Sequence, residues 1–403
     1  MESQSSNENK PRGDLNHNSS SLTSHSSLSL YIHVPFCASK CAYCDFASFP
    51  NREGEWGRYF EALWDELAGW RTRLAGREVA TVFFGGGTPT LVDAGYIVET
   101  LRRAREILPF APDAEITLEG NPGTLTPDKL AAYRQAGVNR LSLGAQSFDD
   151  GLLRALGRIH TAAQAEETLK LAREAGFENL SLDLMYGLPG QDLDMLKESV
   201  EKALGLDPQH ISIYGLQVEE GTLFYRDQQE GKLALPAEAD TEAMYDYMTE
   251  YLPSQGYRRY EISNFARPGK ESRHNLSYWQ DVPYLGLGSA AHSYLDGMRL
   301  ENVADLDEYI NTIKSGSLPL RSEEDPSQQH HMEEFAFLAL RTMKGIDKKK
   351  FKDTFGKDLR SIYGKKINRL VRQGLLQENK RTVSLTKAGA KVGNQVFAEF
   401  LLS

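Results

Sequence analysis

The strongest constraint on the fold of this chain is a regular alternation of short apolar runs and amphipathic segments from residue 30 to residue 214. The runs have the length of strands, and the segments between them repeat apolar residues at helical spacing. The predicted strands are Leu30–Val34, Val79–Phe84, Glu115–Leu118, Arg140–Leu143, Leu180–Met185 and His210–Tyr214, and the predicted helices are Arg52–Leu74, Asp93–Ile107, Pro127–Gln135, Ala162–Ala175 and Leu193–Leu204. Repeated βα units imply a parallel sheet covered by helices.

The regular repetition favours a curved sheet over a flat one, and six strands would make a partial barrel. An open doubly wound sheet is the alternative. Its first glycine-rich turn should read G-x-G-x-x-G, whereas this chain has GGGTP at residues 85–89, after its second predicted strand. The sequence therefore favours an α/β fold based on a partial (β/α)6 TIM-type barrel.

All the cysteines of the chain, Cys37, Cys41 and Cys44, form one C-x3-C-x2-C array after the first predicted strand. Their odd number and close spacing argue against disulfides and favour metal binding. Zinc and ordinary iron–sulfur sites usually take four protein ligands, so three thiols imply a missing ligand or an open coordination position. Three small buried residues that cluster by chance are the less favoured alternative.

Polar residues also follow the other predicted strands. The GGGTP turn, Glu119, Gln146, Asp183 and Gln217 all lie at or just after a strand's carboxyl end, the face on which barrels of this kind build their active sites. Any one of them alone could be a cap or turn residue. Together with Arg158, which can pair with a carboxylate through two hydrogen bonds, they predict one shared cavity.

The cysteine array, with Tyr43 before its third cysteine, resembles the radical S-adenosylmethionine (SAM) superfamily. Within that superfamily, the motifs YIHVPFC, GGGTPT, LEGNP, RLSLGAQSF, LGRIHT and LDLMYGLPGQ, spread over residues 31–191, resemble the oxygen-independent coproporphyrinogen III oxidase family. The resemblance implies that the three cysteines hold three irons of a [4Fe-4S] cluster and that SAM binds the fourth. It places Tyr31, Tyr43, Gly86 and Glu119 around this SAM. Gly87, Thr88, Gln146, Arg158 and Asp183 match positions that bind a second SAM in the oxidases.

Two departures separate the chain from the oxidases. They have a further cysteine two residues after the third, where this chain has Phe46, and they begin with an ordered extension, where this chain has a polar stretch typical of disorder. Both features resemble the haem-chaperone branch of the family, the HemW type. That resemblance implies a protein that binds haem and delivers it to apo-haemoproteins.

The same branch carries an HNxxYW motif, which His274, Asn275, Tyr278 and Trp279 match. An imidazole can ligate haem iron, and aromatic rings can flank a porphyrin. The alternative is that His274 and Asn275 are hydrogen-bonded loop residues while the two aromatic rings pack on the barrel. His292, within a turn of small residues, is a weaker candidate for a haem ligand.

The chain divides into a disordered tail (1–28), the radical SAM partial barrel (29–255), a connecting region with the HNxxYW motif (256–324) and a basic winged-helix-like α+β domain (325–403). The last domain should contain helices Gln328–Arg341, Lys348–Thr354 and Leu359–Gln373, a hairpin over Leu375–Leu385 and a final helix. Between Arg341 and Lys391 it carries 16 Lys and Arg against four acidic residues, although the whole chain has a net charge of −10. Nucleic acid is not expected as its partner, because no aromatic residues alternate with the charges.

The sequence thus predicts a haem chaperone with a [4Fe-4S] cluster, SAM and haem as its cofactors. Its expected partners are an electron donor for the cluster and apo-haemoprotein clients, in solution or at the membrane. Since no apolar run approaches membrane-spanning length and no secretory signal is recognisable, the expected location is the cytoplasm. Whether the chain is an enzyme stays open. The alternatives are oxidative decarboxylation of coproporphyrinogen III and, less favoured, another radical SAM reaction on RNA.

Overall fold

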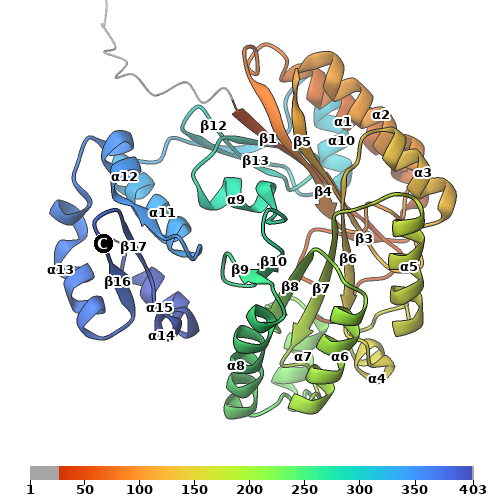
Figure 1. Cartoon of the computed structure of the whole chain (residues 1–403). Coiled ribbons are helices and arrows are strands. Elements are labelled where there is room, and N and C mark those ends of the chain that lie inside the picture. Colours follow the sequence, from red (N-terminus) through yellow and green to blue (C-terminus); the bar gives the residue numbers. More distant parts are fainter. Residues whose placement is uncertain (1–26, 402–403) are drawn as a thin grey trace, which may run out of the picture.

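The computed structural model describes residues 27–401, which form a large α/β unit and a smaller C-terminal domain (Figure 1). Six parallel strands are neighbours in chain order: β1 (Ser27–Val34), β4 (Glu78–Gly86), β5 (Phe110–Gly120), β6 (Arg140–Gln146), β7 (Leu180–Tyr186) and β8 (His210–Gly215). The helices after them are α1 (Trp56–Gly69), α2 (Ala94–Ile107), α3 (Pro127–Gln135), α4 (Asp150–Ala155), α5 (Ala162–Glu174), α6 (Leu193–Gly205), α7 (Leu223–Gln229) and α8 (Glu238–Ser254). The predicted α/β class with six repeated strands is confirmed.

Short strands extend this sheet at both ends, so its 12 strands exceed the six that the sequence predicted. Beyond β1 lie β11 (Tyr284–Leu287), β12 (His292–Leu295), β13 (Met298–Asn302) and β14 (Leu320–Glu324), and beyond β8 lie β10 (Asn264–Ala266) and β9 (Arg258–Arg259). β11 runs parallel to β1, and the other added strands pair antiparallel. Runs this short carry too little periodicity to be recognised in a sequence.

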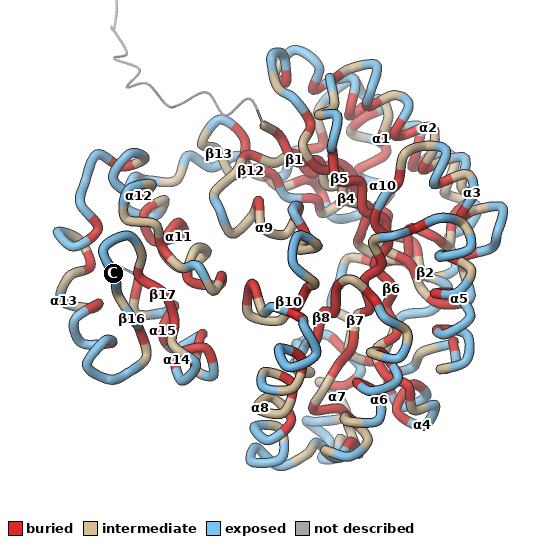
Figure 2. The backbone as a smooth tube through the Cα atoms, viewed as in Figure 1, coloured by how far each residue is buried: buried red, intermediate tan, exposed pale blue. Residues whose placement is uncertain are grey.

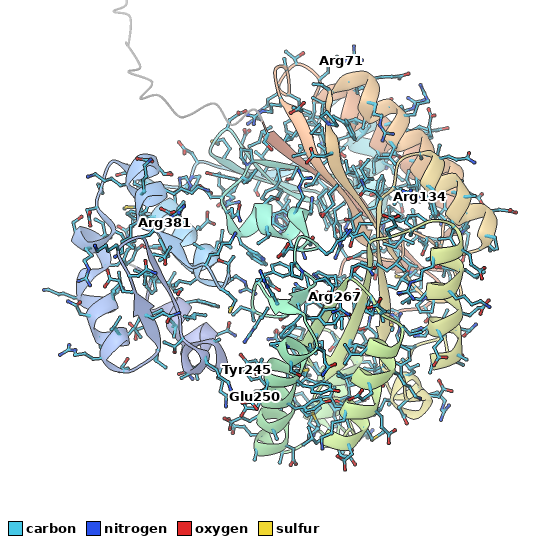
Figure 3. The ribbon with its side chains drawn as sticks, viewed as in Figure 1. Arg71, Arg134, Tyr245, Glu250, Arg267 and Arg381 are labelled. Carbon is cyan, nitrogen blue, oxygen red and sulfur yellow. The ribbon has the colours of Figure 1, made fainter. Side chains whose placement is uncertain are left out.

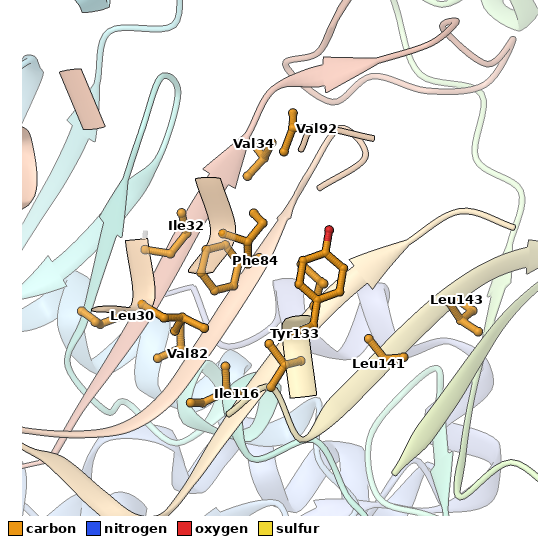
Figure 4. Packing of buried hydrophobic residues seen from close by; sticks show 14 of the residues in the cluster. Leu30, Ile32, Val34, Val82, Phe84, Val92, Ile116, Tyr133, Leu141 and Leu143 are labelled. Atoms are coloured by element: carbon orange, nitrogen blue, oxygen red, sulfur yellow. The ribbon is translucent and has the colours of Figure 1, made fainter. Parts of the chain in front are cut away.

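The two faces of the parallel strands differ in character. Apolar residues at alternate positions face the helices, and Figure 4 shows part of this packing, with Ile32, Phe84 and Leu141 among the labelled residues. The intervening positions put polar side chains on the concave face: Ser29, Thr81, Thr117, Ser142, Asp183 and Ser212. Since side chains alternate along a strand, the hydrophobic pattern that stabilises the barrel also lines its interior with polar groups.

The helices cover the outer face of the sheet, and the buried residues concentrate along the strands and the inner helix faces (Figure 2). Side-chain caps fix several helix starts. Thr161 forms a capping box with Gln164 at α5, and Asp192 accepts a hydrogen bond from the Met195 amide at α6. No helix among residues 27–401 combines the length and the apolar character needed to cross a bilayer.

A buried carboxylate in α1 attaches the added strands to the barrel. Glu66 accepts hydrogen bonds from the Tyr309 hydroxyl at 2.6 Å, the Asn302 amide at 2.7 Å and the Gly288 backbone N–H at 2.9 Å. Tyr309 belongs to α10 (Leu306–Lys314), which packs beside α1. Because a buried charge is tolerated only when it is well hydrogen-bonded, this arrangement fixes how the extension lies on α1.

Glu66→Ala should lower the free energy of unfolding by about 2–3 kcal/mol, because it leaves buried donors without an acceptor. The matched control is Glu61→Ala on the exposed face of the same helix, which should change stability by less than about 0.5 kcal/mol. Urea unfolding of both variants measures the difference. Equal midpoints would contradict a structural role for this carboxylate.

The C-terminal domain has a hydrophobic core of its own, which includes Phe335, Phe351 and Tyr363. Its elements are α11 (Gln328–Leu340), β15 (Ile346–Asp347), α12 (Lys348–Phe355), α13 (Leu359–Arg372), β16 (Leu376–Glu378), β17 (Thr382–Leu385), α14 (Lys387–Lys391) and α15 (Gly393–Ala398). The three strands form a separate small sheet in the order β15-β17-β16. Three helices followed by a hairpin match the winged-helix-like order that the sequence predicted, while the expected single last helix is two short ones.

One correction concerns the N-terminal tail. Residues 1–26 of the expected disordered segment 1–28 lie outside the described residues, but Ser27 and Leu28 are ordered at the start of β1. Leu28 is fully buried and pairs with Val79 of β4. Polar neighbours hid this residue in the sequence, because the apolar run begins clearly only at Leu30.

Candidate functional site

The cysteine loop connects two short parallel strands, β2 (Phe36–Cys37) and β3 (Phe49–Pro50). The middle of the loop is held from two sides, because the Ala42 amide donates to the Leu156 carbonyl at 3.0 Å and the Ala42 carbonyl accepts from the Phe224 amide at 2.9 Å. Ala42, Leu156 and Phe224 also belong to one small hydrophobic cluster. The end of α4 and the start of α7 thus position the loop at the carboxyl end of the barrel.

The three thiols are free and partly buried. Burial raises the pKa of the Cys44 thiol, and the neighbouring Cys41 and Cys37 raise it further. Among residues 27–401, no three His, Cys, Asp or Glu side chains converge on a point suited to a single metal ion. Soft thiol donors are nevertheless the ligand type that iron–sulfur clusters use.

Two polar side chains support the sulfur atoms. The Arg158 guanidinium donates to the Cys41 sulfur at 3.6 Å, and the Thr88 hydroxyl lies 3.7 Å from the Cys37 sulfur. Since the Thr88 oxygen already accepts from the Asn121 amide at 2.9 Å, its own proton is free to point at the sulfur. Donors around thiolates stabilise their negative charge and tune a bound cluster.

The GGGTP turn packs directly on the strand that carries Cys37. The Gly87 amide donates to the Val34 carbonyl at 2.9 Å, and the Thr88 amide donates to the Phe36 carbonyl at 2.8 Å. A Cβ atom on Gly87 would lie 2.6 Å from the Phe36 carbonyl oxygen, so only glycine fits there. Gly86 has a φ of 108°, which other residues rarely adopt.

Glu119 lies on the concave face of the sheet beside this turn. Burial and then the nearby Asp183 carboxylate raise its pKa to about 8, and the Gly86 amide and Arg140 oppose the rise. Asp183 accepts from the Ser142 hydroxyl at 3.3 Å, and burial raises its pKa as well. Two carboxyl groups with raised pKa values favour their neutral forms, which can both donate and accept hydrogen bonds and suit a hydroxyl-rich ligand.

Arg158 links the neighbouring strands at this face. Its guanidinium donates to the Asn121 side chain at 2.6 Å and to the Gly144 carbonyl at 2.7 Å. Gln146 follows a bulge at the end of β6 and has a φ of 64°, which turns its side chain out of the regular strand alternation. Burial raises the pKa of the Tyr43 hydroxyl, and the positive charge of Arg158 partly offsets this rise.

Sequence reasoning missed two residues of this site, His33 and Asn121. His33 Nε2 lies 2.8 Å from the Ala47 carbonyl oxygen. Because a carbonyl can only accept a hydrogen bond, Nε2 must carry the proton. His33 Nδ1 therefore accepts from the Tyr31 hydroxyl, 3.0 Å away. Strand periodicity could have identified both residues, because side chains two positions apart lie on the same face of a strand. His33 is two positions after Tyr31, and Asn121 is two positions after Glu119.

The HNxxYW motif forms the short helix α9 (Arg273–Trp279), which packs on the concave side of β4. His274 is 1% exposed and stacks on Phe83, with ring centroids 5.0 Å apart. Its Nδ1 lies 2.8 Å from the Thr81 hydroxyl, and its Nε2 lies 2.8 Å from the Tyr278 hydroxyl. Burial lowers the pKa of His274 to about 3, with Arg140 as the second cause, so the imidazole is neutral.

The rest of the motif faces other parts of the protein. Burial raises the pKa of Tyr278, and Tyr31, Tyr284 and Glu119 raise it further. The Arg341 guanidinium of the C-terminal domain lies over the Trp279 ring, 4.7 Å from its centroid. The Ser272 hydroxyl caps the helix by accepting a hydrogen bond from the backbone N–H of Asn275. His292 is exposed on β12, apart from this motif.

Residues 31–203 match the Radical SAM superfamily, and residues 327–392 match the HemN C-terminal domain. The heme chaperone HemW of Bacillus subtilis (strain 168) is 39% identical over 374 residues, which cover 93% of this chain and 99% of that protein. The chain belongs to the HemW family. The heme chaperone HemW of Escherichia coli (strain K12) is 42% identical over 269 residues, which cover 66% of this chain and 69% of that protein.

The fold has a solved counterpart in the coproporphyrinogen III oxidase HemN from Escherichia coli, a radical SAM enzyme. The TM-score is 0.82 at 23% identity, and the match covers 94% of this chain and 91% of that one. At this identity the likeness establishes the fold. It confirms the predicted radical SAM barrel with its C-terminal domain.

Membership of the radical SAM superfamily implies a [4Fe-4S] cluster and SAM. The site is chemically suited to a cluster, since Cys37 and Cys41 have hydrogen-bond donors beside their sulfur atoms, and the glycine turn packs directly on the strand that carries Cys37. The assignment of individual residues to the two cofactors stays a prediction.

The basic C-terminal domain uses part of its charge inside the molecule. Lys387 pairs with Glu250 of α8, and Lys391 pairs with Glu242 and Asp246 of the same helix. Figure 3 labels Glu250. Within the domain, Arg360 pairs with Glu378. The three pairs with α8 are partly exposed and contribute little stability each, but they help to orient the domain against α8.

Proposed function

We propose that this chain is a haem chaperone that binds haem at α9, transfers it to apo-haemoproteins and carries a SAM-bound [4Fe-4S] cluster on the cysteine loop. The observation that carries the proposal is the 39% identity, over 93% of the chain, to a relative named heme chaperone HemW. The neutral imidazole of His274 agrees with it, because haem iron binds the unprotonated ring.

In this proposal Cys37, Cys41 and Cys44 would hold the [4Fe-4S] cluster, and SAM would complete its coordination. Tyr31, Tyr43, Gly86 and Glu119 surround that SAM. Gly87, Thr88, Gln146, Arg158 and Asp183 line the neighbouring volume, which one or two SAM molecules occupy. When bound, the cluster supplies an electron to SAM. The residues of the chain hold both groups, exclude water and place Glu119 and Asp183 near the ligand's polar atoms.

The proposed partners are haem, apo-haemoprotein clients in solution or at the membrane, and an electron donor for the cluster, in the cytoplasm. We do not propose a nucleic-acid partner. Phe46 occupies the position of the oxidases' further cysteine and is 64% exposed. A phenyl ring cannot ligate a metal, which supports the chaperone over the oxidase.

Anaerobic haem titration of the protein with its cluster assembled tests this proposal. We expect one haem per chain for the wild type and at least a tenfold weaker affinity for His274→Ala. His292→Ala on exposed β12 is the matched control and should bind like the wild type. Transfer to an apo-cytochrome, followed by its absorption spectrum, tests the second half of the proposal. No stoichiometric haem spectrum, or equal affinities for both variants, would refute the assignment to α9.

The same preparation can be incubated with coproporphyrinogen III, SAM and a reductant. We expect no protoporphyrinogen, and turnover would instead establish oxidative decarboxylation as the activity.

A further inference from the structure

We propose that Thr81 and Tyr278 prepare His274 for iron: Thr81 fixes the imidazole tautomer, and the Tyr278 hydroxyl covers the iron-binding nitrogen until haem displaces it. This inference rests on the proposed function, in which His274 is the axial ligand. It makes Thr81 a positioning residue and Tyr278 a latch, two roles that the HNxxYW motif alone does not reveal.

The tautomer follows from the two hydroxyl partners. A phenol is a stronger acid than an alkyl hydroxyl, so it is the better donor and the poorer acceptor. The Tyr278 phenol therefore donates to Nε2 over their 2.8 Å separation, and Nδ1–H donates to the Thr81 oxygen at 2.8 Å. Nε2 thus keeps a lone pair, while its partner nitrogen is anchored to β4. Histidine ligands of metals commonly donate their second ring N–H in this way.

The packing around the ring determines where iron can enter. Phe83 covers one face of the imidazole, and the ring is almost completely buried. Tyr278 packs edge-on against His274 at 5.0 Å and against Tyr284 at 4.6 Å. The phenol is thus the group that covers Nε2, and iron can reach this nitrogen only after the phenol is displaced.

The C-terminal end of α9 stays fixed while Tyr278 moves. Trp279 is held under Arg341, and the Gln280 carbonyl accepts a hydrogen bond from Lys350 of α12. Rotation of one side chain therefore exposes Nε2, and His274 keeps its Thr81 contact throughout.

Haem titration of three variants tests the proposal on the full chain with its cluster. Tyr278→Phe should tighten haem binding about tenfold, because no hydroxyl competes for a buried lone pair. Thr81→Val should weaken binding about tenfold and change the haem absorption spectrum, since the imidazole loses its anchor. Thr81→Ser keeps the hydroxyl and should restore both the affinity and the spectrum. Nitrogen-15 shifts of labelled His274 should report protonated Nδ1 in the free wild type.

The outcomes separate this inference from the proposed function. If His274→Ala abolishes haem binding while Tyr278→Phe leaves it unchanged or weakens it, haem binds at α9 but the latch is refuted. Protonated Nε2 in the free protein would refute the tautomer. If Thr81→Val does not fold, Tyr278→Phe and the nitrogen shifts still decide. If the wild type binds no haem, the proposed function is refuted. The nitrogen-15 shifts still test the arrangement around the His274 ring in that case, and protonated Nε2 would refute it.

Discussion

Cys41→Ser should remove nearly all cluster-bound iron and sulfide, together with the iron–sulfur absorption, while the protein stays folded. A serine oxygen is a harder ligand with a far higher pKa than a thiol, so one iron loses its anchor. The fold should survive because the Ala42 backbone, rather than the Cys41 sulfur, holds the loop to α4 and α7. Iron and sulfide analysis, with circular dichroism for the fold, measures both parts.

The control for this prediction is Ala38→Ser, which adds a hydroxyl to an exposed position of the same loop. It should assemble the cluster like the wild type. Unchanged iron and sulfide in Cys41→Ser would show that Cys41 is no ligand, and loss of the folded signal would show that the thiol supports the loop itself.

Gly87→Ala should destabilise the protein by about 1–3 kcal/mol and strongly reduce SAM binding. Its methyl group would lie within 3 Å of the Phe36 carbonyl and amide and of the Val34 carbonyl, which are backbone atoms that cannot rotate away. The turn and the strand that carries Cys37 would have to separate. Urea unfolding and SAM binding by calorimetry measure the two effects.

Gly95→Ala is the matched control, because a Cβ atom there meets nothing within 4 Å and the residue lies in the first turn of α2. It should leave SAM binding unchanged and stabilise the protein slightly, since glycine is a poor helix former. If both variants bound SAM like the wild type, the turn would not contribute to the site.

The long periodic elements could be predicted from the sequence, and the distant contacts could not. Helix α3 matches its predicted bounds, whereas β5 begins at Phe110 rather than Glu115. Strand β11 was missed because its four residues pair with β1, some 250 positions earlier in the chain. Such pairing depends on the whole barrel and leaves no local pattern.

The candidate site shows the same division. The positions of Glu119 and Asp183 at strand ends indicated a common face, because parallel strands end together. The contact of Arg158 with the Cys41 sulfur joins residues 117 positions apart and needed coordinates. For His274 the sequence offered two roles, a haem ligand and a hydrogen-bonded residue. The structure describes partners for both ring nitrogens.

Tyr278 and Trp279 end α9 and are neighbours in sequence, but they lie in different surroundings. Tyr278 reaches the barrel interior, and Trp279 lies beneath Arg341 of the C-terminal domain. Successive helical residues point about 100° apart, so one peptide unit connects the two surroundings. Because Arg341 and Lys350 hold the end of α9, the C-terminal domain helps to set the position of the helix turn that carries Tyr278 inside the barrel.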